Sequence, residues 1–443
     1  MHHTDRDNPP RVALTTLGCK LNQYDTEVVR EQFLRAGYQV VPFDQPADVY
    51  VVNSCTVTSR SDRDSRRLAR QAKRRSPQAT VVVTGCYAQT DALALADIPA
   101  IDLVVGNLEK AHLADLLADR ARGVRVSRID RQRRFDEPCV SAFGEHTRAF
   151  VKIQDGCDSA CAYCIVPHAR GPSRSRPPGD VLDQVRRLAD AGYREVILVG
   201  VHLGAYGQDL DDDVCLADVA ESLVEIENLS RLRLSSIEPR EVDDRLIALA
   251  RDCPKVCRHF HIPMQSGDDH VLARMNRPYT SAVFAELVER IAEQVPGCGL
   301  GADVLVGFPG ETEAAFARTR HLLEGLPLTY LHVFSYSPRR GTPAALMPDQ
   351  VQEELKKRRC RELRDLSQRK LATFCDGLVG QTLHILVEDR PGNDGPLTGL
   401  SDNYVRAHFD GPLEVVGHAV PVTVTGSANG AVAGRLLAKP RPD

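Results

Sequence analysis

The stretch Asp155-Gly-Cys-Asp-Ser-Ala-Cys-Ala-Tyr-Cys164 decides the fold of the central part of this chain. It places Cys157, Cys161 and Cys164 in a C-x3-C-x2-C spacing, directly after an apolar segment, residues 149–153, that predicts a strand. A short loop leaving a strand can bring three thiolates around one inorganic group, and soft thiolates prefer iron–sulfur units or zinc. Three protein ligands on a four-iron cluster would leave one iron open to a substrate or cofactor, which usually marks a reactive site.

Two less reactive interpretations stay open at this point. The three thiols could hold a structural zinc ion with His168 as the fourth ligand, or they could be small core residues. The spacing favours the iron–sulfur interpretation over both.

Length and composition set the broader limits. At 443 residues, the chain is expected to form two or three domains, and 42% hydrophobic with 26% charged residues is ordinary for a globular protein. The N-terminus is polar and no run of 18 apolar residues occurs, so we expect a cytoplasmic protein without membrane contact. Thirteen dispersed cysteines indicate reduced thiols, some of them metal ligands. A net charge of −4 leaves any argument for nucleic-acid binding to local basic runs.

Residues 11–120 alternate short apolar runs with helical patterns, which predicts an α/β domain with a doubly wound parallel sheet. Cys19, Cys55 and Cys86 each follow a predicted strand, at the sheet edge where open α/β sheets bind ligands. We interpret them as a second trio of metal-cluster ligands. Each cysteine alone could instead fill a buried strand end. The expected strands are 11–17, 48–52, 80–83 and 103–105, and the expected helices are 23–36, 59–75, 89–96 and 109–119.

Residues 121–147 are predicted to be a linker, and residues 148–371 to form a partial (β/α)6 barrel with a connecting helix. Such barrels carry their sites at the carboxyl ends of the strands, where His202, Glu238, Gln265 and Glu311 would lie. The two glutamates could instead be favourable first-turn acids of helices, and His202 a hydrogen-bonded loop residue. The expected strands are 149–153, 195–199, 232–236, 260–262, 302–306 and 330–334.

Residues 375–442 change to short β runs with glycines, which predicts a small five-strand barrel of the oligonucleotide-binding sort. Its expected strands are 382–388, 404–408, 412–416 and 419–425. Tyr404 and Phe409 are candidates for stacking on RNA bases, with core packing as the alternative for at least one. Two basic runs could hold phosphates or could be solvated helix faces. They consist of Arg60, Arg63, Arg66, Arg67, Arg70, Lys73, Arg74 and Arg75, and of Lys356, Lys357, Arg358, Arg359 and Arg361.

Taken together, the motifs resemble the methylthiotransferases of the radical S-adenosylmethionine superfamily. That family combines an N-terminal cluster domain, a partial barrel and a C-terminal TRAM barrel. The opening Gly18-Cys-Lys-Leu-Asn-Gln-Tyr24 looks most like its MtaB branch. The other supporting motifs are 53–58, 85–89, 234–239, 261–267 and 303–311.

The resemblance implies two [4Fe-4S] clusters and bound S-adenosylmethionine, with the first cluster on Cys157, Cys161 and Cys164 and the auxiliary cluster on Cys19, Cys55 and Cys86. Tyr163 would lie against the adenine of S-adenosylmethionine. Glu238 and Gln265 are hypothesised contacts to the same cofactor, by their position. The Gly-Gly-Glu run of many radical enzymes is absent, because Gly200-Val-His202 stands there.

The MtaB branch implies methylthiolation of carbon 2 of N6-threonylcarbamoyladenosine in tRNA, next to the anticodon. The implied partners are tRNA and an electron donor such as a flavodoxin or ferredoxin, acting on a monomer. Alternative substrates are isopentenyladenosine in tRNA and an aspartate of a ribosomal protein. A zinc-containing RNA-binding protein is the alternative without catalysis.

Overall fold

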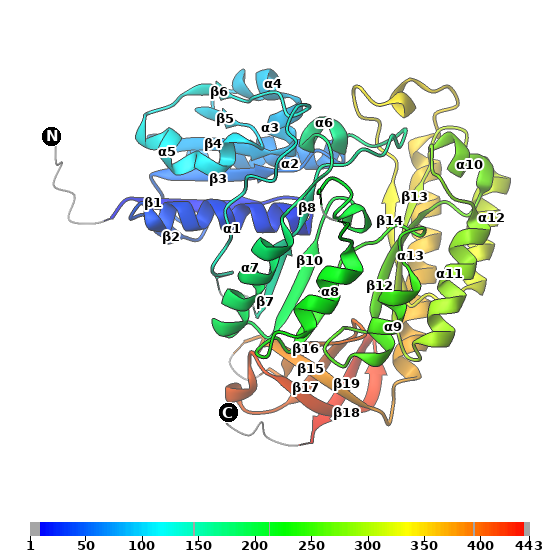
Figure 1. Cartoon of the computed structure of the whole chain (residues 1–443). Coiled ribbons are helices and arrows are strands. Elements are labelled where there is room, and N and C mark those ends of the chain that lie inside the picture. Colours follow the sequence, from blue (N-terminus) through cyan, green and yellow to red (C-terminus); the bar gives the residue numbers. More distant parts are fainter. Residues whose placement is uncertain (1–8, 145–146, 212, 393–394, 438–443) are drawn as a thin grey trace.

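The computed structural model describes residues 9–144, 147–211, 213–392 and 395–437. The N-terminal residues 1–8, part of the segment expected to carry no export signal, lie outside this part. Within the described ranges, none of the helices combines the length and the apolar character needed to cross a membrane. Figure 1 shows an N-terminal α/β layer, a central open barrel and a C-terminal β-barrel.

The N-terminal domain is built on a six-stranded parallel sheet in the order β2-β1-β3-β4-β5-β6. Alternate residues of its strands enter two separate hydrophobic clusters, so both faces are covered by helices and the doubly wound prediction is confirmed. β6 lies inside the segment expected as a linker. Because it pairs with β5, it belongs to the N-terminal sheet instead. The strands are β1 Arg11–Thr16, β2 Gln39–Val41, β3 Val49–Ser54, β4 Thr80–Gly85, β5 Leu103–Val105 and β6 Gly123–Arg125. The helices are α1 Lys20–Arg35, α2 Ser59–Arg75, α3 Cys86–Thr90, α4 Ala92–Ala96 and α5 Leu113–Ala118.

The central domain has six parallel strands in two sheets, β11-β10-β7 and β12-β13-β14. Two isolated parallel bridges, Leu232 to Val256 and Ser236 to His261, connect the sheets. No pairing closes β7 onto β14 among the described residues, which confirms the partial barrel. The strands are β7 Arg148–Lys152, β10 Glu195–Val199, β11 Arg231–Leu234, β12 His259–Gln265, β13 Gly299–Val306 and β14 Tyr330–Ser335. The main helices are α7 Pro178–Asp190, α8 Leu216–Val224, α9 Asp244–Asp252, α11 Ser281–Gln294 and α12 Glu313–Gly325.

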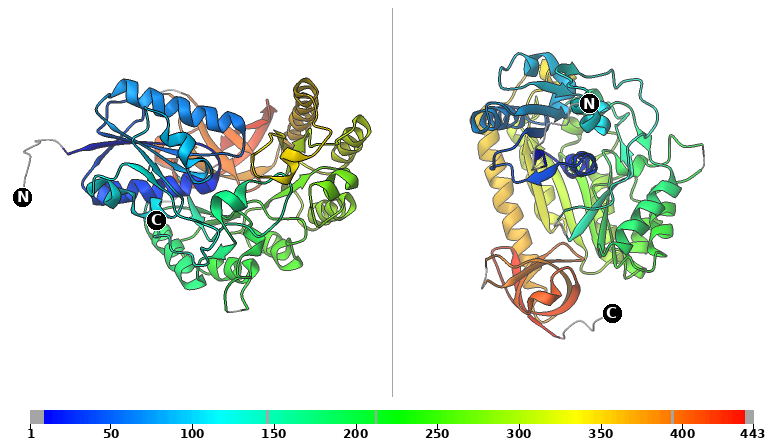
Figure 2. Two further views of the ribbon diagram at one scale, coloured as in Figure 1. Left: turned by 90° about the horizontal axis from the view of Figure 1, so that it is seen from above. Right: turned by 90° about the vertical axis from the view of Figure 1, so that its left-hand side faces the viewer.

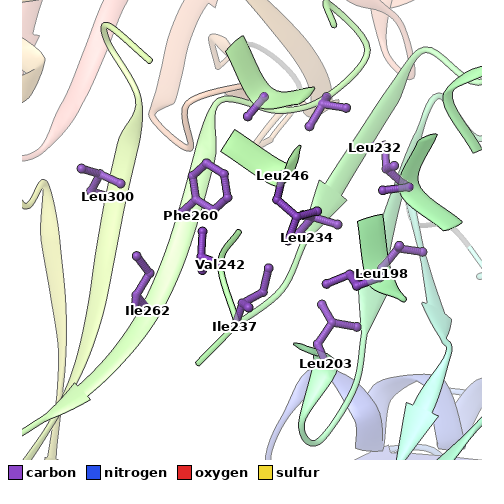
Figure 3. Packing of buried hydrophobic residues seen from close by; sticks show 14 of the residues in the cluster. Leu198, Leu203, Leu232, Leu234, Ile237, Val242, Leu246, Phe260, Ile262 and Leu300 are labelled. Atoms are coloured by element: carbon purple, nitrogen blue, oxygen red, sulfur yellow. The ribbon is translucent and has the colours of Figure 1, made fainter. Parts of the chain in front are cut away.

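The two faces of these strands differ in chemistry. Leu232 and Leu234 pack with Phe260 and Ile262 into the large cluster between the sheets and the outer helices (Figure 3). Because side chains alternate along a strand, Arg231 and Arg233 point to the opposite face, toward the inside of the open barrel. The interior is therefore polar instead of being filled by branched aliphatic side chains.

The C-terminal domain is a closed five-stranded barrel in the order β15-β16-β17-β19-β18, as predicted. The right-hand view of Figure 2 shows the long helix α13, Glu353–Asp376, leading along the central domain to it. The prediction of a strand at 412–416 is wrong, since a 3-10 turn, Leu413–Val415, follows Pro412 there. The strands are β15 Thr382–Asp389, β16 Leu397–Ser401, β17 Arg406–Asp410, β18 Ala419–Ala428 and β19 Ala431–Leu436.

This barrel packs against the amino ends of the central strands. Arg233 donates hydrogen bonds to the carbonyls of Ser401 and Asp402, at 3.0 and 2.9 Å. The Tyr404 ring stacks on His259 with centroids 4.5 Å apart, and Phe409 is buried in the barrel core. Phe409 therefore has the core-packing role expected for at least one of the two rings, while the partly exposed Tyr404 ring already stacks on a histidine of the central domain.

Candidate active site between two cysteine-bearing loops

The three N-terminal cysteines follow three neighbouring strands of the parallel sheet. Cys19 precedes α1 after the end of β1, Cys55 directly follows β3, and Cys86 is the first residue of α3 after β4. Burial, together with the neighbouring charges of Cys86 and Cys19, raises the pKa of the Cys55 thiol to about 11. The topology therefore brings these three thiols to one sheet edge.

Two glycines make this approach possible. Gly18 has φ +101° and Gly85 has φ +94°, in the region where a side chain is strained. A Cβ atom on Gly18 would lie 2.7 Å from the Cβ of Cys55, and one on Gly85 would lie 2.4 Å from the carbonyl oxygen of Ser54. Any larger residue would push the cysteine loops apart.

The loop with the second trio is closed by backbone pairing. β8, Gln154–Asp155, pairs antiparallel with β9, Arg174–Ser175, so the chain returns to its starting point after Cys157, Cys161 and Cys164. The Cys157 amide donates to the carbonyl of Gly171 at 3.0 Å. Burial raises the pKa of Cys164 to about 12, with Cys161 and Cys157 as neighbouring contributors.

Several cationic or hydrogen-bonding side chains contact these thiols. His202 Nδ1 lies 3.7 Å from the Cys157 sulfur, and its Nε2 lies 2.6 Å from Glu241. Burial raises the pKa of Cys157, but hydrogen bonds from His202 and Ser159 outweigh it and lower the pKa overall. Arg277 donates to the Cys161 sulfur at 3.3 Å. His202 is thus a hydrogen-bonded loop residue.

Glu241 and Arg277 escaped the sequence analysis because neither directly follows a strand. Glu241 comes three residues after Glu238, and Arg277 follows the short helix α10, Asp269–Arg274. The arginine after that helix carried no spacing signal of its own.

The distances between the thiol sulfurs bear on whether each trio could bind a single zinc ion. Two thiolates on one zinc lie at most about 4.6 Å apart, because each Zn–S bond is about 2.3 Å. Over the described ranges, only His261, Asp303 and His332 form a group of three donors that all lie within 4.8 Å of one another. Neither cysteine trio meets this spacing, so the three thiols of each trio lie farther apart than the ligands of a single zinc ion.

The candidate zinc ligand His168 is exposed on α6, Val166–Arg170. It lines a cavity of about 430 Å³ together with Gln89, Asp91, Ile165 and Arg339. Gln89 comes three residues after Cys86, and Ile165 comes directly after Cys164. The cavity thus lies between the two cysteine-bearing loops, and His168 belongs to its wall.

The three expected cofactor contacts all lie at the carboxyl end of the barrel, but their side chains differ in the partners that they already have. The Tyr163 ring meets Phe308 edge to face, with centroids 6.4 Å apart. Glu238 forms an ion pair with Arg277, and burial raises its pKa. Gln265 has φ +61°, which is strained for a residue with a side chain. Its amide has no hydrogen-bond partner in the described part of the chain, which leaves it available to a ligand.

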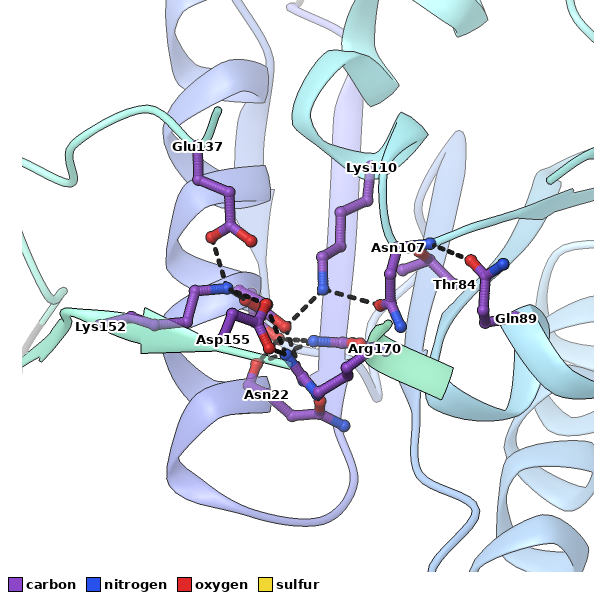
Figure 4. Close-up of polar contacts among 12 residues, drawn as sticks. Asn22, Thr84, Gln89, Asn107, Lys110, Glu137, Lys152, Asp155 and Arg170 are labelled. Atoms are coloured by element: carbon purple, nitrogen blue, oxygen red, sulfur yellow. Dashed lines mark hydrogen bonds and ion pairs between the residues drawn. The ribbon is translucent and has the colours of Figure 1, made fainter. Parts of the chain in front are cut away.

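A buried ionic network joins the two cysteine-bearing loops (Figure 4). Asp25 of α1 accepts hydrogen bonds from Lys152 at 2.6 Å and from Arg170 at 2.9 Å, and it also pairs with Lys110. Arg170 continues to Asp155, two residues before Cys157, at 3.0 Å. The network therefore fixes the N-terminal domain directly above the loop that carries Cys157.

Asn22 extends this network to the first trio. Its amide donates to the carbonyls of Leu17 and Ser54, at 2.7 and 3.0 Å, and its oxygen accepts from Arg170 at 2.6 Å. It thereby links the residues before Cys19 and Cys55 to the helix that follows Cys164. Sequence analysis could not identify this role, since an asparagine at a helix start is common.

Comparisons with known proteins agree with this arrangement. Residues 11–106 match the model of "Uncharacterized protein family UPF0004", and residues 151–323 match that of the radical SAM superfamily. The radical S-adenosylmethionine methyltransferase TsrM from Kitasatospora setae has a similar fold, with a TM-score of 0.56 and 17% identity over 76% of this chain and 77% of that one. The radical SAM match implies a [4Fe-4S] cluster and S-adenosylmethionine in the central domain.

Two relatives cover almost the whole chain. The threonylcarbamoyladenosine tRNA methylthiotransferase MtaB of Bacillus subtilis is 40% identical and covers 93% of each chain. A tRNA-2-methylthio-N(6)-dimethylallyladenosine synthase from Syntrophotalea carbinolica is 36% identical, over 93% of this chain and 96% of the relative. With both domain models matched in order and relatives aligned from end to end, the chain belongs to the radical S-adenosylmethionine methylthiotransferase family.

Proposed function

We propose that this protein adds a methylthio group to carbon 2 of N6-threonylcarbamoyladenosine in tRNA, next to the anticodon. The carrying observation is that two trios of cysteines, on separate domains, lie on loops joined by one buried ionic network. Similarity of 39 to 40% to relatives named for this reaction supports the choice of substrate.

The chemistry explains why two trios are needed. The carbon 2 hydrogen of adenine is not acidic enough for a side-chain base near pH 7, so a cofactor must supply the difficult step. When bound, the radical SAM cluster with S-adenosylmethionine would supply hydrogen abstraction, an auxiliary cluster would supply the sulfur, and a second S-adenosylmethionine would supply the methyl group.

The chain's own residues would hold and shield these groups. Cys157, Cys161 and Cys164 would bind the first cluster, while His202 and Arg277 offset the negative charge of its thiolates. Cys19, Cys55 and Cys86 would bind the second. Tyr163 and Gln265 would contact S-adenosylmethionine. Glu238 would act mainly by holding Arg277 in place.

Helix α2 provides a surface suited to tRNA phosphates. Its exposed cations are spaced three and four residues apart and therefore lie along one face, where Arg60 and Arg67 also pair with Asp64. Such a stripe binds phosphates with strong salt dependence. Its members are Arg60, Arg63, Arg67, Arg70 and Arg74.

The second basic run contributes less than the sequence suggested. Lys356 and Arg359 are 7% and 1% exposed, and Arg359 pairs with Glu311 at 2.7 Å. Arg359 thus anchors α13 to the loop after β13, and Lys356 donates to the carbonyl of Tyr336 after β14, so neither side chain is available to RNA. A flavodoxin or ferredoxin as electron donor and a monomeric state complete the proposal.

Nucleoside mass spectrometry of tRNA from cells lacking the gene tests this function. We expect loss of the methylthio form of threonylcarbamoyladenosine, with the methylthio form of isopentenyladenosine intact. Re-expressed wild-type protein should restore it, whereas Cys86→Ala and Cys161→Ala should not. Cys253→Ala, outside both trios, serves as the matched control. Loss of the isopentenyladenosine product instead would favour the reaction named for the dimethylallyladenosine relative.

A further inference from the structure

The two substrates named among the relatives differ in charge. A threonylcarbamoyl group on N6 carries a free carboxylate, whereas a dimethylallyl group is wholly apolar. An enzyme that selects the first needs a cation that reaches the base and is not already neutralised, because buried carboxylates require a charged or hydrogen-bonded partner.

Most cations that line the open barrel already form ion pairs with carboxylates of the protein itself. Arg233 and Arg231 share Glu195, at 2.8 and 3.6 Å, and Arg148 pairs with Glu388 at 2.6 Å. These arginines also hold the C-terminal barrel in place. Their N–H donors are therefore already taken up by oxygen atoms of the protein.

Lys20 is different. It is the first residue of α1, directly after Cys19, and its side chain is only partly exposed. In the described part of the chain it has no carboxylate within ion-pair distance and no hydrogen-bond partner. The charges that act on its ammonium group belong to the barrel interior, namely Arg233, Arg148, Glu195 and Asp303. The side chain therefore extends from the auxiliary cysteine loop into the barrel.

The opposite wall is open to a ligand. Asp303 is already bonded to His261 at 2.8 Å and lies 3.4 Å from His332, so it does not neutralise Lys20. The His332 side chain is 50% exposed, and Phe334 on the same face of β14 is 44% exposed although it is large and apolar. An apolar surface for a base thus lies on the same wall as a polar surface, and Asp303 of this wall lies close enough to act on the unpaired ammonium group.

We propose that the Lys20 ammonium group binds the carboxylate of the threonylcarbamoyl group and so selects this substrate over the dimethylallyl one. This inference rests on the proposed function and deepens it. Lys20 lies next to a cysteine expected to bind the auxiliary cluster, so the contact would place the modified base beside the sulfur source. Loss of a charge-assisted hydrogen bond in such a setting weakens binding roughly 10- to 100-fold.

The test is a cycle of binding measurements in which protein and RNA are each changed at one group. Anaerobically reconstituted protein is titrated with an anticodon stem–loop carrying threonylcarbamoyladenosine, or an analogue whose carboxylate is an amide. We expect wild-type protein to bind the amide roughly 10- to 100-fold more weakly, and Lys20→Met to bind both RNAs equally, at the weaker level. Lys370→Met is the matched control, because Lys370 is also partly exposed but lies on α13 and bonds to Leu326. It should discriminate like wild type.

Three outcomes would count against the inference. Lys20→Met would overturn it by still preferring the acid over the amide, or by losing S-adenosylmethionine binding or iron together with RNA. Equal binding of the acid and the amide by wild type would overturn it too, while leaving the proposed function standing. Failure of wild type to prefer the modified stem–loop over one with plain adenosine would argue against the proposed substrate itself.

Discussion

Replacement of Asp25 by asparagine should destabilise the contact between the N-terminal and central domains far more than an ordinary surface substitution. Asp25 is fully buried and is the carboxylate shared by Lys110, Lys152 and Arg170. Lys152 and Arg170 keep Asp155 as a second partner, but Lys110 would keep only the amide oxygen of Asn107, at 2.9 Å. Burial already holds the pKa of Lys110 below its usual value, with Asp25 acting against that shift. Asp25→Asn therefore leaves a buried ammonium group without a counter-charge.

The expected cost is about 3–5 kcal/mol, the usual range for breaking a buried ion pair on one side. Urea unfolding followed by circular dichroism measures it, and with a slope of about 3 kcal/mol/M the midpoint should fall by about 1–1.7 M. Asp252→Asn is the control, since it removes the same charge from an exposed pair with Arg251 and should leave the midpoint unchanged. The double variant Asp25→Asn with Lys110→Met should recover part of the loss, because it removes the stranded charge as well.

The pH dependence has a defined sign. Burial raises the pKa of Asp25, but Lys110, Lys152 and Arg170 outweigh burial and hold it well below its usual value. The stabilisation is therefore fully present above the unfolded pKa of about 4 and is lost only as the pH falls below it. The difference between wild type and Asp25→Asn should be constant from pH 5 to 8 and shrink in stronger acid. A decrease in the free energy of unfolding of less than about 1 kcal/mol at pH 7 would refute the conclusion that this network holds the N-terminal domain to the central domain.

Three further predictions concern the cysteine trios, the cofactor contact and the C-terminal barrel. Cys86→Ala should lower the iron content of anaerobically reconstituted protein from about eight to about four per chain while keeping S-adenosylmethionine cleavage, and an unchanged iron content would exclude Cys86 as a ligand. Gln265→Ala should weaken S-adenosylmethionine binding measured by calorimetry without loss of iron, and equal affinity would reject the contact. Arg233→Met leaves Glu195 with Arg231 alone and removes two bonds to the C-terminal barrel, so hydrogen exchange in β16 should accelerate, whereas full protection would contradict the docking role.

Local periodicity and spacing determined much of this protein without a structure. Strand and helix alternation predicted the doubly wound sheet and the open barrel, because each element needs only a buried face of the right period. The position of Cys19, Cys55 and Cys86 after successive strands was readable for the same reason, since parallel strands end at a common edge. The C-x3-C-x2-C loop needed no tertiary information at all.

Tertiary structure alone decided which charges are free and which are occupied. Arg359 belongs to a basic run in the sequence but is buried and paired with Glu311. The Tyr404 ring likewise stacks on His259. Lys20 is an ordinary lysine in the sequence, and only the folded barrel leaves it without a counter-ion. Pairing of charges depends on contacts between residues far apart in the chain, and periodicity carries no record of such contacts. The sequence therefore specified the two trios of cysteines, while the packing of three domains decided how they face one another and what lies between them.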